Sequence, residues 1–122
     1  MKYLLVMAGG AAGTLLRYVV GATIMSRYGG RFPLGTLAVN LSGSFLIGLA
    51  MTLLTERFAP HPNLRLFLVI GLLGGYTTFS SFEWETYAAM REGGTWLGLA
   101  NIAGSVTLGY AAVWLGVMLG RR

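Results

Sequence analysis

The chain has 122 residues and a mass of 13.1 kDa, which leaves room for one domain, or at most two very small ones. Hydrophobic residues make up 55% of it and charged residues only 11%, whereas an ordinary soluble domain carries about 25% charged residues. This composition excludes a disordered tail, a nucleic-acid-binding arm and a water-soluble globule. The net charge of +5 is typical of basic residues that flank membrane segments, and the absence of cysteine excludes disulfides and thiolate metal sites.

Charged residues divide the chain into four apolar windows. The first contains only Arg17, the second and fourth are uncharged, and the third is uncharged up to Glu83. A bilayer core of about 30 Å is crossed by roughly 20 helical residues. We therefore predict an all-α integral membrane fold, in which residues 1–122 form a single domain of four transmembrane helices. The predicted spans lie at about 3–25, 34–54, 66–90 and 95–119.

The distribution of positive charge barely specifies the orientation of these spans. Four spans place both termini on one side of the membrane, together with Lys2, Arg57, Arg65, Arg121 and Arg122. Arg27, Arg31 and Arg91 lie on the other side. So small a difference allows two interpretations. Either a few arginines fix one orientation, or copies insert both ways and pair as an antiparallel dimer.

Small or polar residues recur four positions apart on every predicted span, which places them on one face of each helix. These stripes are Gly9, Gly13, Arg17 and Gly21; Asn40, Ser44 and Gly48; Gly71, Gly75 and Phe79; and Asn101, Ser105 and Gly109. Because helices in lipid associate through close packing of small residues, we expect these stripes to form the helix contacts. One copy can hardly enclose a wet pathway, whereas a homodimer could.

The third span contains an unusual stretch for a membrane helix. Gly74 and Gly75, followed by hydroxyl residues, weaken the helix near its middle. One interpretation is a glycine-rich packing kink whose Ser and Thr side chains bond back to the preceding turn. The other is a broken helix whose free backbone groups bind an ion. The aromatic pair Phe79 and Phe82, followed by Glu85, favours the second interpretation.

The segment 74–82 (GGYTTFSSF), together with Asn40 in the second span and Arg17 in the first, resembles the Fluc family of bacterial double-barrelled fluoride channels. The resemblance covers essentially the whole chain. It implies a dual-topology antiparallel homodimer with two fluoride pores and a structural sodium ion on the two-fold axis. The main-chain carbonyls of Gly74 and Thr77 from both copies would bind this sodium.

The resemblance also implies the residues of the pore. The rings of Phe79 and Phe82 would meet the anion with their positive edges, and the Asn40 amide would donate to it. The pore-lining hydroxyl residues would be Ser81 and Ser105, with Thr78 close by. Arg17 and Glu85 would act in the vestibule or in gating, although Arg17 could instead snorkel to the interface or pair with a glutamate. No role follows for Glu83 or Asn101.

We therefore expect passive fluoride export across a bacterial inner membrane, which would reduce fluoride toxicity. One alternative is a proton-coupled exporter of the small multidrug type, which needs a carboxylate deep in its first span, where this chain has Arg17. Another is a non-transporting scaffold subunit of the membrane. We expect no enzymatic activity, because the sequence shows no set of nucleophile, base and orienting residue.

Overall fold

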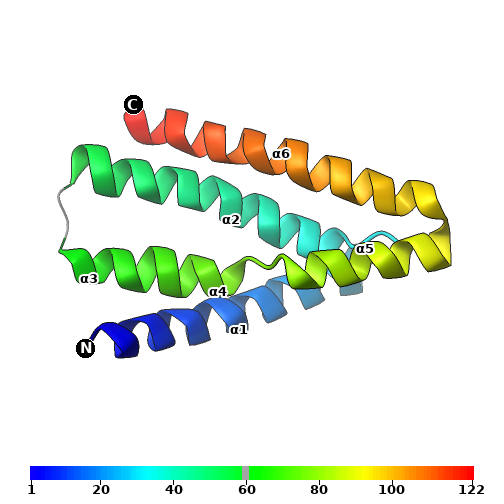
Figure 1. Ribbon diagram of the computed structural model, residues 1–122, viewed down its shortest axis with the longest axis horizontal. Coiled ribbons are helices and arrows are strands. Elements are labelled where there is room, and N and C mark those ends of the chain that lie inside the picture. Colours follow the sequence, from blue (N-terminus) through cyan, green and yellow to red (C-terminus); the bar gives the residue numbers. More distant parts are fainter. Residues whose placement is uncertain (59–60) are drawn as a thin grey trace.

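The computed structural model describes residues 1–58 and 61–122, and within them it is entirely helical apart from short connections (Figure 1). The first span is α1 (Lys2–Tyr28), and the second is α2 (Leu34–Thr52), which continues as the π-helical segment η1 (Leu53–Arg57). The third begins with α3 (Pro62–Arg65), the π-helical η2 (Leu66–Leu73) and α4 (Gly74–Tyr76). After a break it resumes as α5 (Ser80–Gly93), and the fourth span is α6 (Thr95–Arg121).

The four spans run up and down, so that both termini lie at the same end of the bundle (Figure 1). Each is long and apolar enough to cross a membrane, and α1 and α6 reach 27 residues. The predicted all-α membrane fold of four helices is therefore confirmed. The third span is interrupted near its middle, between α4 and α5, as the paired glycines and hydroxyl residues predict.

Glycines bring the backbones of neighbouring spans into direct contact. A Cβ on Gly13 would fall against the carbonyl oxygen of Leu72, so α1 crosses the third span with no room for a side chain. In the same way, Gly48 of α2 lies against the backbone of Val113, and Gly116 of α6 lies against that of Phe45. The predicted stripes of the first three spans thus form backbone contacts at Gly9, Gly13, Gly48, Gly71 and Gly75, because only glycine permits so close an approach. On α6 the close contact is made by Gly116, outside the predicted stripe.

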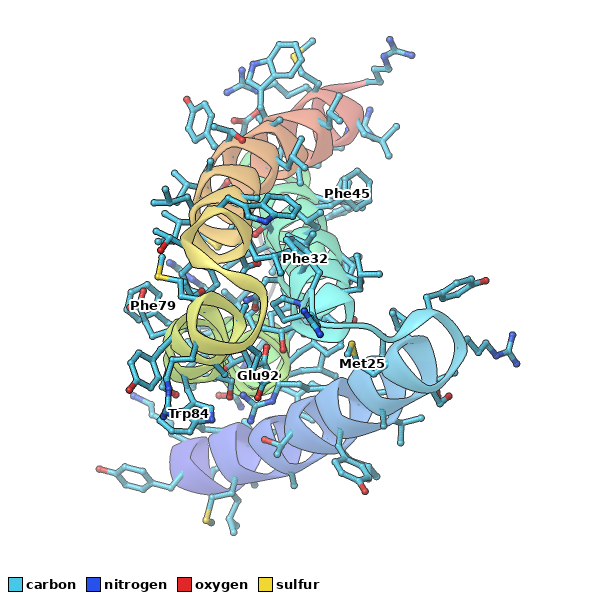
Figure 2. The ribbon with its side chains drawn as sticks, turned by 90° about the vertical axis from the view of Figure 1, so that its right-hand side faces the viewer. Met25, Phe32, Phe45, Phe79, Trp84 and Glu92 are labelled. Atoms are coloured by element: carbon cyan, nitrogen blue, oxygen red, sulfur yellow. The ribbon has the colours of Figure 1, made fainter. Side chains whose placement is uncertain are left out.

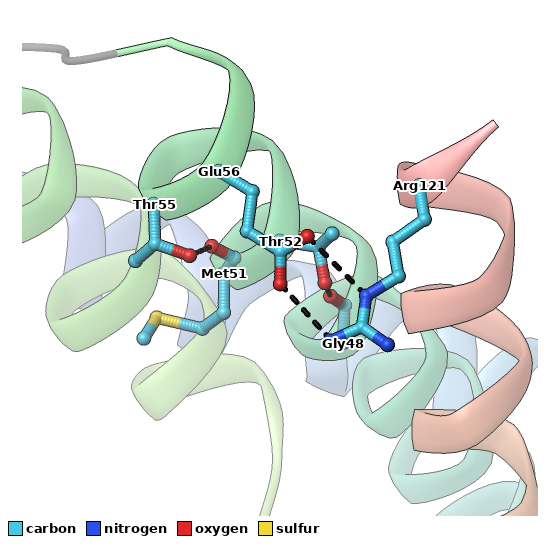
Figure 3. Close-up of polar contacts among 6 residues, drawn as sticks. All are labelled: Gly48, Met51, Thr52, Thr55, Glu56 and Arg121. Carbon is cyan, nitrogen blue, oxygen red and sulfur yellow. Dashed lines mark hydrogen bonds and ion pairs between the residues drawn. The ribbon is translucent and has the colours of Figure 1, made fainter.

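Polar contacts close one end of the bundle (Figure 3). Arg121 donates two hydrogen bonds to the Glu56 carboxylate, at 3.2 and 3.1 Å, and so joins the end of α6 to η1. This ion pair is exposed, so it adds at most about 1 kcal/mol to stability. Beneath it, the buried Thr52 hydroxyl donates to the Gly48 carbonyl at 2.8 Å. These contacts order the end of α2 and lie away from the interruption in the third span.

Replacing Gly13 by Ala should destabilise the fold, because the new methyl group would overlap the Leu72 carbonyl and force α1 away from the third span. Overpacking of this kind costs about 1–3 kcal/mol, more than the roughly 1 kcal/mol that alanine gains over glycine in a helix. Gly21→Ala is the matched control on the same helix, since nothing lies within 4 Å of its Cβ position. Thermal unfolding in detergent should show a lower melting temperature for Gly13→Ala and an unchanged one for Gly21→Ala. Equal melting temperatures would contradict this packing.

Candidate functional site

The break in the third span consists of three residues, Thr77, Thr78 and Phe79, between α4 and α5 (Figure 1). Thr77 is extended, with φ −80° and ψ 157°. Both its backbone N–H and its hydroxyl donate to the Leu73 carbonyl at 3.0 Å. These two bonds close the last turn of α4, so the helix ends in an ordered way.

Asn40 of α2 hydrogen-bonds to both backbone groups of Thr78 in the break. Its Nδ2 donates to the Thr78 carbonyl at 2.8 Å, and its Oδ1 accepts from the Thr78 N–H at 2.8 Å. One side-chain amide therefore supplies both partners that a continuous helix would have given Thr78. An amide nitrogen carries two protons, so one Asn40 N–H is not used by this pair.

The two carbonyls predicted to bind sodium each lose the donor that an unbroken helix would direct at them. The Thr78 N–H, which α-helical geometry directs at Gly74, is donated to Asn40 instead. The Ser81 N–H, which would reach Thr77, donates to the Thr78 hydroxyl at 3.3 Å. Side chains have thus taken the helical donors of the Gly74 and Thr77 carbonyls.

An open groove of about 590 Å³ lies along one side of the break. Seven of the predicted site residues line it: Asn40, Gly74, Thr77, Thr78, Phe79, Phe82 and Ser105. The rings of the two phenylalanines stand 5.9 Å apart, centroid to centroid, and are tilted by 47°. Phe82 is buried, at 6% exposure, whereas Phe79 is 74% exposed and points away from the bundle (Figure 2). One wall of the groove is therefore left open in a single chain.

The other predicted site residues line a second groove, of about 410 Å³, between α1, the start of α2 and α5. It contains Arg17, Ser81 and Glu85, and Thr78 lines both grooves. Ser81 and Ser105, predicted to belong to one set of hydroxyls, therefore lie in different grooves of the same chain. Among the described residues Arg17 makes no ion pair, and Glu85 Oε2 is buried with no hydrogen-bond partner.

Several polar residues near the site carry contacts that sequence reasoning did not assign. Ser42 and Tyr76 share a hydrogen bond of 2.9 Å between α2 and α4. Asn101 of α6 donates to the Thr86 hydroxyl of α5 at 2.8 Å, and both side chains are buried. The spacing could have indicated this role for Thr86, since a residue four positions after Phe82 can place its hydroxyl near the Phe82 carbonyl.

The sequence matches known proteins along nearly its full length. Residues 4–117 match the family described as "CrcB-like protein, Camphor Resistance (CrcB)". A relative from Solibacter usitatus is 70% identical over 122 residues, which cover all of both chains. Relatives from Acidobacterium capsulatum and Thermus thermophilus are each 48% identical. These cover 100% and 98% of this chain, and 98% and 94% of the relatives.

Each of these three relatives is named a fluoride-specific ion channel, FluC. The family match spans all four helices and includes every residue of the two grooves, from Thr14 to Val106. The chain is a multi-pass membrane protein, and it belongs to the CrcB-like family of which these fluoride channels are members.

Proposed function

We propose that the chain is a channel that conducts fluoride passively out of the cell across a bacterial inner membrane. The observation that carries this proposal is the groove at the helix break, where an amide, two phenyl rings and a hydroxyl meet at membrane depth. Its relatives carry the same activity in their names. A channel requires no energy source, and fluoride that enters as HF and ionises at cytoplasmic pH leaves down its own gradient.

The groove contains groups that can replace the hydration shell of a fluoride ion. The unused Asn40 N–H is one donor at the break. Phe79 and Phe82 can present ring edges, which carry partial positive charge. A neutral aliphatic wall would remove water from the anion without replacing the lost hydrogen bonds. A narrow passage between such edges would admit fluoride more readily than the larger chloride.

A second copy of the chain would complete this pathway. Phe79 is largely exposed, and the backbone of the break faces an open groove. Lipid does not tolerate irregular backbone at membrane depth, so protein or a wet cavity must cover it. The small charge difference between the two ends of the bundle is compatible with copies that insert both ways. We therefore include an antiparallel homodimer in the proposal.

A sodium ion fits the donors at the break. The Gly74 and Thr77 carbonyls have lost their helical donors, and carbonyl oxygens are the hard ligands that a hard cation prefers. Two copies that meet at their breaks would bring four such oxygens together. The ion would supply a fixed positive charge that neutralises these carbonyls and joins the two breaks. Gly74 and Thr77 would hold it through the main chain.

The alternatives receive less support from the groove. A proton-coupled exporter needs an exchangeable acid in its first span, and α1 carries Arg17 and no carboxylate between Lys2 and Tyr28. A scaffold subunit would not need an open polar groove at the break. A fluoride channel accounts both for an arginine in α1 and for the open groove at the break, so it is the function that the site supports best.

Proteoliposomes loaded with fluoride or chloride provide the direct test. The wild-type chain should release fluoride and retain chloride, and Phe79→Ile should slow fluoride release by about tenfold or more, because the ring edge is lost. Phe79 is exposed in the single chain, so this change should leave folding intact. Fluoride release should also fall when sodium is replaced by N-methylglucamine during purification and assay. Vesicles that retain fluoride would overturn the proposed function.

Asn40→Asp should abolish fluoride release. The aspartate loses the donor to the Thr78 carbonyl, places an oxygen against that carbonyl, and adds a negative charge where the anion must pass. Asn63→Asp makes the same chemical change in the exposed helix α3 and should behave as wild type. Circular dichroism would establish that both variants are folded. Undiminished efflux through Asn40→Asp would show that the amide is not needed.

Dual insertion can be tested with one introduced thiol, because the chain contains no cysteine. Gly30→Cys lies in the exposed connection between α1 and α2, where nothing lies within 4 Å of the Cβ position. A membrane-impermeant maleimide applied to spheroplasts should label about half of the copies, and detergent should make the rest reactive. Complete labelling, or none, before detergent would show a single orientation and exclude the antiparallel pair.

A further inference from the structure

A chain of hydrogen bonds runs from the groove into the contact between α5 and α6. The Ser105 hydroxyl donates to Asn101 Oδ1 at 3.3 Å, and Asn101 Nδ2 donates to the Thr86 hydroxyl at 2.8 Å. The Thr86 hydroxyl donates to the Phe82 carbonyl at 2.7 Å. Asn101 and Thr86 are 2% and 6% exposed, so neither side chain reaches the groove. Ser105 lines the groove and is only partly buried.

The Phe82 carbonyl sets the direction of every bond in this chain. A carbonyl can only accept, so Thr86 must donate its single proton to it. The Thr86 oxygen can then only accept, which requires Asn101 to point its NH2 group at Thr86. Asn101 Oδ1 is thereby left facing Ser105, and it accepts the single proton of that hydroxyl. The Ser105 proton therefore points inward, and its lone pairs are left for the groove.

The bond at the groove end is the weakest of the three. Hydroxyl hydrogen bonds usually span 2.5–3.0 Å, and the Ser105 bond at 3.3 Å is longer than the other two. An anion in the groove needs a donor, and Ser105 can provide one only by turning its proton away from Asn101. The anion and the Asn101 carbonyl thus compete for one proton.

We propose that Asn101 is a positioning residue that contributes to anion selectivity, by holding the Ser105 proton against all but strong hydrogen-bond acceptors. This inference rests on the proposed function. Fluoride, with its charge concentrated on a small ion, accepts hydrogen bonds strongly enough to turn Ser105 outward. Chloride, with a more diffuse charge, accepts weakly and leaves the proton on Asn101. Thr86 and the Phe82 carbonyl act by keeping the Asn101 oxygen pointed at Ser105.

Asn101→Leu tests this role, because leucine is similar in size and offers no acceptor. It should raise the ratio of chloride to fluoride efflux from proteoliposomes by about two- to tenfold, the range of one net hydrogen bond. Thr86→Val should shift the ratio in the same direction, and Thr86→Ser, which keeps the hydroxyl, should preserve the wild-type ratio. Thr107→Val is the control on α6, since within the described part of the chain that exposed hydroxyl bonds only to Ala103 of its own helix.

The Ser105→Ala background separates proton competition from a packing effect. Without the hydroxyl, Asn101→Leu should no longer change the ratio. A change of equal size in both backgrounds would overturn the inference, as would wild-type ratios in Asn101→Leu and Thr86→Val.

If Asn101→Leu does not fold, the comparison of Thr86→Val with Thr86→Ser decides alone. Wild-type vesicles that release no fluoride would refute the proposed function, whereas wild-type release with an unchanged ratio in the variants would refute this inference only.

Discussion

The structure of the site depends on one constraint: a membrane helix that breaks must find partners for the backbone groups that the break releases. Asn40 meets most of this requirement at Thr78, since a single amide provides both a donor and an acceptor at 2.8 Å. No other uncharged side chain except glutamine carries both groups in this form. The pairing fixes α2 to the third span and takes the helical donor of the Gly74 carbonyl, while the Thr78 hydroxyl takes that of the Thr77 carbonyl. The hydrogen bonds that order the break therefore also leave these two carbonyls free of their helical partners.

The two grooves share this break but differ in chemistry. One combines aromatic edges, an amide and a hydroxyl, and the other combines Arg17, Ser81 and Glu85. Thr78 lines both, so the residue that Asn40 fixes also forms the boundary between them. An anion attracted by the guanidinium on one side would meet donors on the other only near this boundary. The break is therefore the place where the two grooves meet.

Much of the fold could be predicted from the sequence because its signals are local. The four apolar windows predicted the four helices, and the paired glycines before hydroxyl residues predicted the break between Tyr76 and Ser80. The glycine stripes predicted which faces meet, since only glycine allows contacts such as Gly13 against Leu72. Most predicted pore residues, among them Asn40, Phe79 and Ser105, line one groove, although their roles there stay predictions.

Other features depend on contacts between distant residues, which periodicity does not report. Asn40 was predicted to donate to an anion, but no local pattern indicated that it would bond to Thr78, 38 residues away. Asn101 received no role because its partner Thr86 lies on another helix. Ser81 and Ser105 were grouped by residue type, yet they line different grooves, Ser81 from α5 and Ser105 from α6.

The eight-residue η2 segment winds more loosely than the α-helix that follows it, and it leads directly to α4 and the break. Each residue turns the chain by about 100° in an α-helix and by less in a π-helix, so adding or removing one residue in η2 would rotate Thr78 away from Asn40. Exchange of one apolar side chain for another in this segment would have no such effect. The length of η2 is therefore more tightly constrained than its amino-acid composition. Among related sequences, insertions or deletions in this segment should be far rarer than substitutions.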